Sequence, residues 1–374
     1  MVKGGFFMTH YNMFDYIKWR GDLTFEERPF NAIDALILNM VSFLDFDHLI
    51  ATFPSTEERK IDELILEYFK GKDEKKLSLG LIIPKDMFKV AKMIIEKKRY
   101  KNIRVCNFIN HVSVTESKQF AALTFIIDDF QLYITFRGTD DSLVGWAEDV
   151  SMLSVFPIPA QKDSSYYLTK IASLYPNKEI FIGGHSKGGN LSVYSSLYTT
   201  EEVQKRIVKV YSLDGPGFYP GTLDANVLNL MRDRIIHVIP NGGIVGRLFE
   251  LDVPPIIVKS DSKGLDQHNP FYWYIECDHF VEASAFNEDS NHIKEEVDAL
   301  IASMSEEDKN GLTEDLNSFI ASLKPNNLLE FANMKNVVSV LFNKYKMKHK
   351  NIRYLLKLYN IFRRNKAIVI KFQN

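Results

Sequence analysis

Cysteine is scarce in this chain of 374 residues, which contains only Cys106 and Cys277. Two thiols are too few for a disulfide framework or for a zinc site with four cysteine ligands. No apolar stretch approaches the roughly 18 residues of a membrane span, and residues 1–22 reach charged groups before any apolar run of signal-peptide length. We therefore expect a protein of a reducing, cytoplasmic compartment.

Acidic residues are absent from residue 331 onward, although the chain contains 48 of them. The same segment carries eleven Lys and Arg residues, while the whole chain has a formal net charge of −2. Such a split predicts either a tail that contacts an anionic partner such as a membrane, or a tail that docks on the acidic body. We expect no nucleic-acid partner, and the oligomeric state stays open.

The period of the apolar residues changes along the chain. Helical spacing predicts a mainly helical N-terminal region over residues 1–110. Two apolar runs around a "DD" turn then predict a hairpin, and short apolar strands alternate with helices as far as about residue 290. This alternation predicts an α/β core over 111–290 with a mostly parallel central sheet and helices on both faces. Residues 291–374 are expected to form a helical, basic C-terminal extension.

A serine lies between two glycines in "GGHSKGGN", directly after an apolar run typical of a buried strand and before a helical one. The segment from Gly184 to Gly188 fits the G-x-S-x-G pattern of a nucleophile elbow. Glycine is needed beside the serine because a sharp strand-to-helix turn brings neighbouring backbone too close for side chains. Ser186 is therefore the candidate nucleophile, with a tight βα turn as the plain structural alternative.

A serine nucleophile needs a base that is oriented by an acid. Asp214 ends the next apolar strand, "IVKVYSLDG", and is the candidate acid, although a turn aspartate of this kind can also cap the following segment. The strand after it ends in "PNGG", which offers only Asn241. Asp261 is the reserve.

Four histidines are candidates for the base or its surroundings. His268, in a loop after the last apolar strand, is the favoured base, and His279 is its competitor. His237 lies within a predicted strand and is expected to be a core residue. His185 occupies the variable position of the elbow and is expected to support the turn rather than to catalyse.

Acyl transfer also needs hydrogen-bond donors for the oxyanion. The N–H of Lys187, which follows the nucleophile, is one candidate, and Thr139 in "FRGTDDSLVGW" is the other, with a hydroxyl that reinforces its own N–H. The alternative for this loop is helix capping by Thr139 or Asp141. We expect Arg137 and Asp149 to pair and brace the loop. The Lys187 side chain is expected to point away from the nucleophile, which disfavours a Ser–Lys dyad.

The stretches "TFRGTDDSLVGWAEDV", "GGHSKGGNLSVY", "LDGPGF" and "GLDQHNPFYW" resemble the lipase-like α/β-hydrolases of bacteria that are catalogued as a domain of unknown function. The first two also resemble the class 3 lipases. In that class the acid follows the strand that here ends in "NGG", whereas "SLDGPGF" resembles the acid segment of pancreatic-type lipases, at Asp214. The resemblance implies an α/β-hydrolase fold and a serine hydrolase, without a substrate.

These patterns together predict a hydrolase of carboxylic esters with a Ser186–His268–Asp214 triad and no metal or organic cofactor. Thioesterase, amidase and acyltransferase activities use the same triad and stay open. The alternative is an inactive hydrolase-fold protein that binds an anionic membrane or a partner through the basic tail, residues 331–374. Five aromatic residues are candidates for an acyl pocket or for the core: Phe218, Tyr219, Phe271, Tyr272 and Trp273.

Overall fold

The computed structural model describes residues 10–80, 83–322 and 349–364. Its central sheet has eight strands in the order β1 to β8, so that each strand pairs with its neighbours in the sequence. The pairs from β1 to β4 are antiparallel, and the pairs from β4 to β8 are parallel. The strands are Arg59–Lys60, Arg104–Ser113, Lys118–Ile126, Gln131–Phe136, Glu179–His185, Ile207–Leu213, Ile235–Pro240 and Ile256–Val258.

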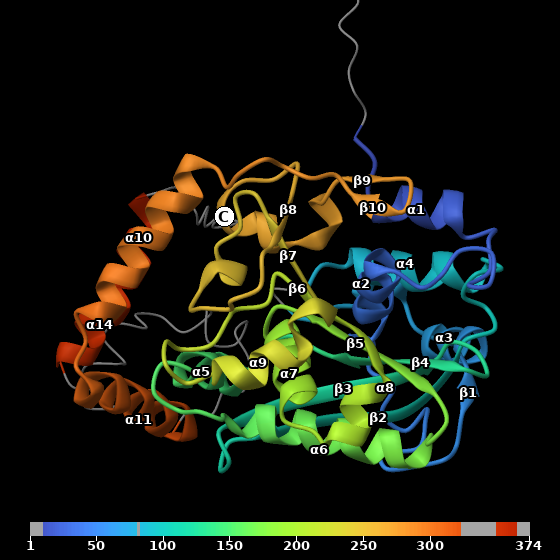
Figure 1. The fold of residues 1–374 in the computed structure, drawn as a ribbon, viewed down its shortest axis with the longest axis horizontal. Helices are drawn as coiled ribbons and strands as arrows, with labels where there is room; N and C mark the ends of the chain where they lie inside the picture. The colour runs from blue at the N-terminus through green and yellow to red at the C-terminus, as the bar shows by residue number, and fades with distance from the viewer. Residues whose placement is uncertain (1–9, 81–82, 323–348, 365–374) are drawn as a thin grey trace, which may run out of the picture.

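Helices cover both faces of this sheet (Figure 1). Alternate residues of a strand point to opposite faces, so Tyr133 contacts the N-terminal helices while Ile134 contacts the helices that follow the hairpin. The first layer contains α1 (Met13–Arg20), α2 (Ala32–Val41), α3 (Ile61–Phe69) and α4 (Asp86–Ile95). The second contains α5 (Leu143–Ser151), α6 (Pro159–Leu174), α7 (Lys187–Leu197), α8 (Glu201–Arg206) and α9 (Ala225–Met231). The α/β-hydrolase fold predicted from the sequence is confirmed.

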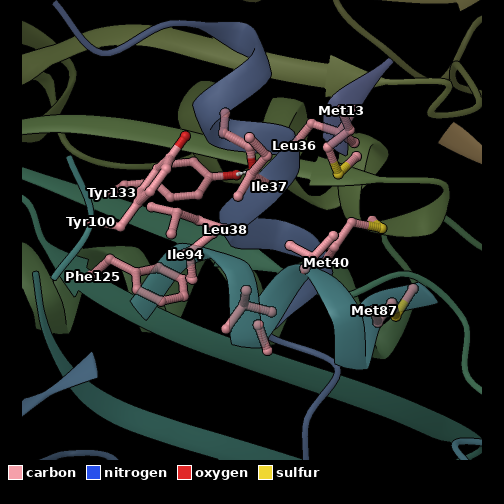
Figure 2. Close-up of a cluster of buried hydrophobic side chains, with 14 of the residues drawn as sticks. Met13, Leu36, Ile37, Leu38, Met40, Met87, Ile94, Tyr100, Phe125 and Tyr133 are labelled. Atoms are coloured by element: carbon pink, nitrogen blue, oxygen red, sulfur yellow. Dashed lines mark hydrogen bonds between the residues drawn. The ribbon is translucent and has the colours of Figure 1, made fainter. Parts of the chain in front are cut away.

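The core of the first layer is centred on α2, a helix of which every residue except Ala32 is buried. Figure 2 shows Leu36, Ile37 and Leu38 of this helix among side chains of α4 and of the sheet, including Tyr133. A helix that is buried on all sides must be covered on every side. The sheet on one side and the other N-terminal helices on the other supply that cover.

A buried ion pair also joins this layer. The Arg99 guanidinium lies 2.5 Å from the Asp34 carboxylate of α2, and neither side chain is exposed to solvent. The Tyr100 hydroxyl donates a hydrogen bond of 2.8 Å to Asp34. Arg99 also donates to four backbone carbonyls of residues 23–29, so its N–H groups are satisfied. These bonds fix the loop between α1 and α2.

Strand β2 was missed by the sequence analysis. Its pairing with β3 shifts register between Cys106 and Ile109, where Asn107 has a φ of 57°. A bulge breaks the two-residue alternation that marks a strand in a sequence. The segment expected to be mainly helical therefore contains the start of a long strand.

The C-terminal extension packs against the body. It contains α10 (Glu288–Ala302), α11 (Glu306–Ser322) and α14 (His349–Arg364), which gather along one side of the molecule in orange and red (Figure 1). Ile352 and Ile361 of α14 are buried, and Lys350 pairs with Asp308 of α11. Residues 323–348 and 365–374 of the expected helical extension lie outside the described residues.

Part of the apolar face of α14 is therefore used within the chain, while Leu356 and Tyr359 stay exposed. Lys350, Arg353, Lys357 and Arg363 are exposed as well. Contact of residues 331–374 with an anionic membrane stays a prediction, for which sedimentation with anionic vesicles is the measurement. Among the described residues, no helix combines the length and apolar character needed to cross a membrane.

Replacement of Arg99 by methionine is predicted to destabilise the fold by about 3–5 kcal/mol, because it leaves the Asp34 carboxylate buried without a charge partner. Lys98→Met is the matched control, since Lys98 forms an exposed pair with Glu27 and its loss is expected to cost less than about 1 kcal/mol. Urea unfolding of the two variants measures both values. Equal loss of stability would contradict the role given to the buried pair.

Candidate active site

Ser186 occupies the turn between β5 and α7. Its backbone has a φ of 60° and a ψ of −133°, a strained conformation for a residue with a side chain. The Ser186 N–H donates to the Leu213 carbonyl at the end of β6 over 3.0 Å, which fixes the turn to the neighbouring strand. The serine is thus held at the carboxyl edge of the parallel sheet, where ligand sites of such sheets occur.

Both glycines of the elbow lie against backbone. A Cβ atom on Gly184 would come within 2.4 Å of the carbonyl group of Gly188. A Cβ atom on Gly188 would lie 2.1 Å from the Phe136 carbonyl oxygen at the end of β4. These positions therefore admit only glycine, for the steric reason that the sequence pattern indicates.

The structure brings Asp214 and His268 together at the same edge. Asp214 is fully buried and has a φ of 49°, and its N–H donates to the Val238 carbonyl over 2.7 Å. One carboxylate oxygen accepts the Gly246 N–H at 2.9 Å, and the other accepts the His268 Nδ1–H at 2.6 Å. In the neutral imidazole only one ring nitrogen carries a proton. Because Nδ1 donates that proton to the carboxylate, the Nε2 of His268 keeps its lone pair.

The rejected alternatives lie in other surroundings. Asp261 accepts a hydrogen bond from the Tyr274 hydroxyl, and His279 lies in β10 (His279–Phe280), which pairs only with the short β9 (Ile275–Glu276). His237 is a buried residue of β7 whose Nδ1 is 3.3 Å from the Ser212 hydroxyl. Burial lowers the pKa of His237 to about 4.

The turn after β7, at which the class 3 lipases that this sequence resembles have their acid, faces the side chains of Gln267 and Asn287. A Cβ atom on Gly242 would lie 2.1 Å from the Gln267 amide nitrogen, and the Gly242 N–H donates to the Gln267 amide oxygen over 2.8 Å. An aspartate does not fit there without moving this glutamine.

The loop after β4 approaches the elbow through Gly138. A Cβ atom on this residue would lie 3.0 Å from the Cβ of Ser186, so only glycine allows the approach. Thr139 follows, and its hydroxyl donates to the Asp149 carboxylate over 2.6 Å. The proton of this hydroxyl is therefore engaged, while the oxyanion role of Thr139 stays a prediction. Its backbone N–H is the remaining donor.

Two smaller expectations for this loop are corrected. The capping residue of α5 is Ser142, which accepts the Gly145 N–H, rather than Thr139 or Asp141. Arg137 lies 3.9 Å from Asp140 and does not pair with Asp149, whose partner is Thr139. Asp140, three residues after Arg137 in the same loop, is therefore the acidic neighbour of the guanidinium, whereas Asp149 lies on α5.

The side chain of Lys187 points away from the nucleophile, as expected. Its ammonium group is buried and donates to the Gln119 carbonyl at 2.9 Å, the Gln119 amide oxygen at 2.6 Å and Glu148 at 2.9 Å. Three acceptors match the three protons of an ammonium group. Lys187 can therefore contribute only its backbone N–H at the first turn of α7.

The aromatic candidates divide between core and surface. Phe218, Phe271 and Trp273 are buried in the core clusters, while Tyr272 is exposed. Tyr219 contacts Lys309 of the C-terminal extension. The three buried rings belong to the core, and a part in an acyl pocket stays a prediction.

His185 is closer to the acid and base than the sequence suggested. One ring nitrogen of His185, one of His268 and one carboxylate oxygen of Asp214 lie within 4.8 Å of one another, a spacing that also suits a metal ion. A direct hydrogen bond joins His268 to Asp214, and His185 binds the His268 carbonyl, so the ligand atoms are directed to protein partners. The arrangement fits proton transfer better than metal coordination.

The mostly parallel sheet with helices on both faces places the chain in the α/β-hydrolase fold class, and the Ser186 turn and the His268–Asp214 pair lie at the carboxyl edge of this sheet. Residues 94–318 match the pattern of the Mbeg1-like family, which is more than half of the chain, and the chain belongs to this family. No curated protein matches it.

Two solved lipase structures and one structure of MDLA are similar to this chain. They are the M37 lipase (16% identity, TM-score 0.35, 58% of this chain and 70% of the lipase), Lip2 lipase from Yarrowia lipolytica (15%, 0.33, 55% and 82%) and a mutant form of MDLA from Penicillium cyclopium (12%, 0.37, 68% and 85%). These values carry no conclusion about the activity of this chain.

Asp149→Asn is predicted to stabilise the protein at pH 8 by up to about 3 kcal/mol, with a gain that shrinks as the pH falls through 6. Burial raises the pKa of Asp149 to about 6, so folding favours the protonated form and the ionised form costs free energy above that pH. The exposed Asp129 supplies the control, Asp129→Asn. Urea unfolding at pH 5 and pH 8 measures the difference, and a gain of the same size at both pH values would contradict the cause.

Proposed function

We propose that this protein is a serine hydrolase that cleaves carboxylic esters through an acyl-enzyme. The observation that carries the proposal is the short His268–Asp214 hydrogen bond at the sheet edge that also holds the strained Ser186 turn. An isolated serine hydroxyl is a weak nucleophile, and a histidine oriented by a buried carboxylate is the usual means of activating it.

In the proposed reaction, the Ser186 hydroxyl attacks the ester carbonyl and its proton passes to Nε2 of His268. Asp214 keeps the imidazole in the required tautomer and stabilises the imidazolium that forms. The same proton then goes to the leaving alcohol, which completes the acyl-enzyme. Water, deprotonated by His268, releases the acid and restores Ser186.

The negative charge on the carbonyl oxygen needs donors that are fixed before the reaction. The backbone N–H groups of Lys187 and Thr139 are the proposed donors, because both flank the contact between Gly138 and Ser186. Loss of one such donor typically costs about 3 kcal/mol of transition-state stabilisation. The buried bonds of the Lys187 and Thr139 side chains hold these backbone groups in place.

A fluorophosphonate probe is predicted to label wild-type protein on the peptide that contains Ser186, because such probes react with activated serines. Ser186→Ala should abolish the label. Asp214→Asn should slow labelling by about 10³–10⁴-fold, since it removes the carboxylate that selects the histidine tautomer. Peptide mass spectrometry and the time course of labelling measure these effects.

The control is Ser196→Ala. Ser196 is a buried serine of α7, the helix that follows Ser186, and its hydroxyl donates to the Val193 carbonyl. This variant should be labelled like wild type. Absence of label on folded wild-type protein would refute the proposed activity. A panel of oxyesters, thioesters and amides with matched acyl groups then separates esterase from thioesterase and amidase.

A further inference from the structure

A hydrogen bond joins the Ser186 turn to the loop that carries His268. It is made by His185, a residue that the proposed chemistry does not use. His185 Nε2 lies 2.8 Å from the backbone carbonyl oxygen of His268. A carbonyl oxygen can only accept, so the His185 Nε2 carries the proton and donates it. The residue next to the nucleophile therefore binds the backbone of the proposed base directly.

The two imidazole rings also pack together. Their centroids are 4.3 Å apart at an interplanar angle of 32°. The centroid of the Trp273 ring lies 6.0 Å from that of His185. His185 is buried, and burial lowers its pKa well below the usual range. The ring is consequently neutral and adds no like charge beside His268 when that residue accepts a proton.

Other contacts hold the base loop, η4 (Gly264–His268), but they come from elsewhere. The Trp273 indole N–H donates to the Gln267 carbonyl over 2.8 Å, and the Gly242 N–H donates to the Gln267 side chain over 2.8 Å. These bonds fix the loop to segments that do not carry the nucleophile. His185 provides the bond from the elbow itself.

We propose that His185 is a positioning residue, which holds the imidazole of His268 in register with Ser186 through its bond to the His268 backbone. This inference rests on the proposed serine-hydrolase function and goes further by assigning a role to the variable residue of the elbow. Because Ser186 and His185 are consecutive, any shift of the turn carries the base loop with it. The two reacting side chains therefore keep their separation.

Two substitutions separate the parts of this contact. His185→Phe keeps an aromatic ring against His268 but removes the N–H donor, while His185→Gln replaces the ring by an amide that places a donor at a similar reach. Misplacement of a catalytic group by about 1 Å costs about 100-fold in rate. We expect the fluorophosphonate labelling rate to fall about 10–100-fold in the phenylalanine variant and to recover largely in the glutamine variant.

Ester hydrolysis provides the second readout. The loss in His185→Phe is expected in kcat, with KM nearly unchanged, because the acylation geometry is altered and substrate binding is not. Trp273 is buried, whereas Trp19 and Trp146 are exposed. The fluorescence that acrylamide does not quench therefore comes from Trp273, and its loss would show that the loop carrying His268 is no longer packed. Urea unfolding shows that each variant is folded.

The outcomes distinguish the inference from the function beneath it. Wild type that is labelled, with a slow phenylalanine variant and a restored glutamine variant, supports the positioning role. Equal labelling of all three folded proteins overturns the positioning role and leaves the hydrolase intact. Equally slow labelling of both variants, together with Trp273 fluorescence that acrylamide quenches, also overturns the positioning role. The His185 ring would then act only in packing. Absence of label in wild type overturns both proposals.

Discussion

The approach of the elbow to the end of β4 is the constraint on which the site depends. Gly188 leaves no room for a methyl group against the Phe136 carbonyl, and Gly138 leaves little against Ser186. Close backbone contact brings the first turn of α7, which follows Ser186, against the end of β4 and the loop after it. Any side chain at these glycines would separate the nucleophile from the proposed oxyanion donors, because backbone cannot yield as a flexible side chain does.

The buried charges of Lys187 and Glu148 behind this contact are balanced by hydrogen bonds. Lys187 and Glu148 form an ion pair of 2.9 Å with almost no solvent exposure, and Gln119 supplies the other acceptors for the ammonium group. Arg99 and Asp34 repeat this solution on the opposite face of the sheet. Such pairs add little net stability, but removal of one partner is costly, so they fix the relative positions of the elements that carry them.

The C-terminal extension contributes to the surroundings of the acid. Ser290 at the start of α10 donates to the Gly243 carbonyl over 2.6 Å and accepts from Arg247 at 2.7 Å. The segment between them contains Gly246, whose N–H binds Asp214. The start of α10 thus supports the turn over residues 243–247, which holds the Asp214 carboxylate.

The sequence by itself determined the α/β order, the elbow and the need for its glycines, because these follow from short-range periodicity and local sterics. It also selected Asp214 and His268 as candidates, and the structure places these two in contact while their catalytic roles stay proposals. Tertiary structure alone decided the rest. The partners of Thr139 and Asp149, and the contact of His185 with a carbonyl 83 residues away, depend on how distant loops meet at the sheet edge, and no local pattern encodes that distance.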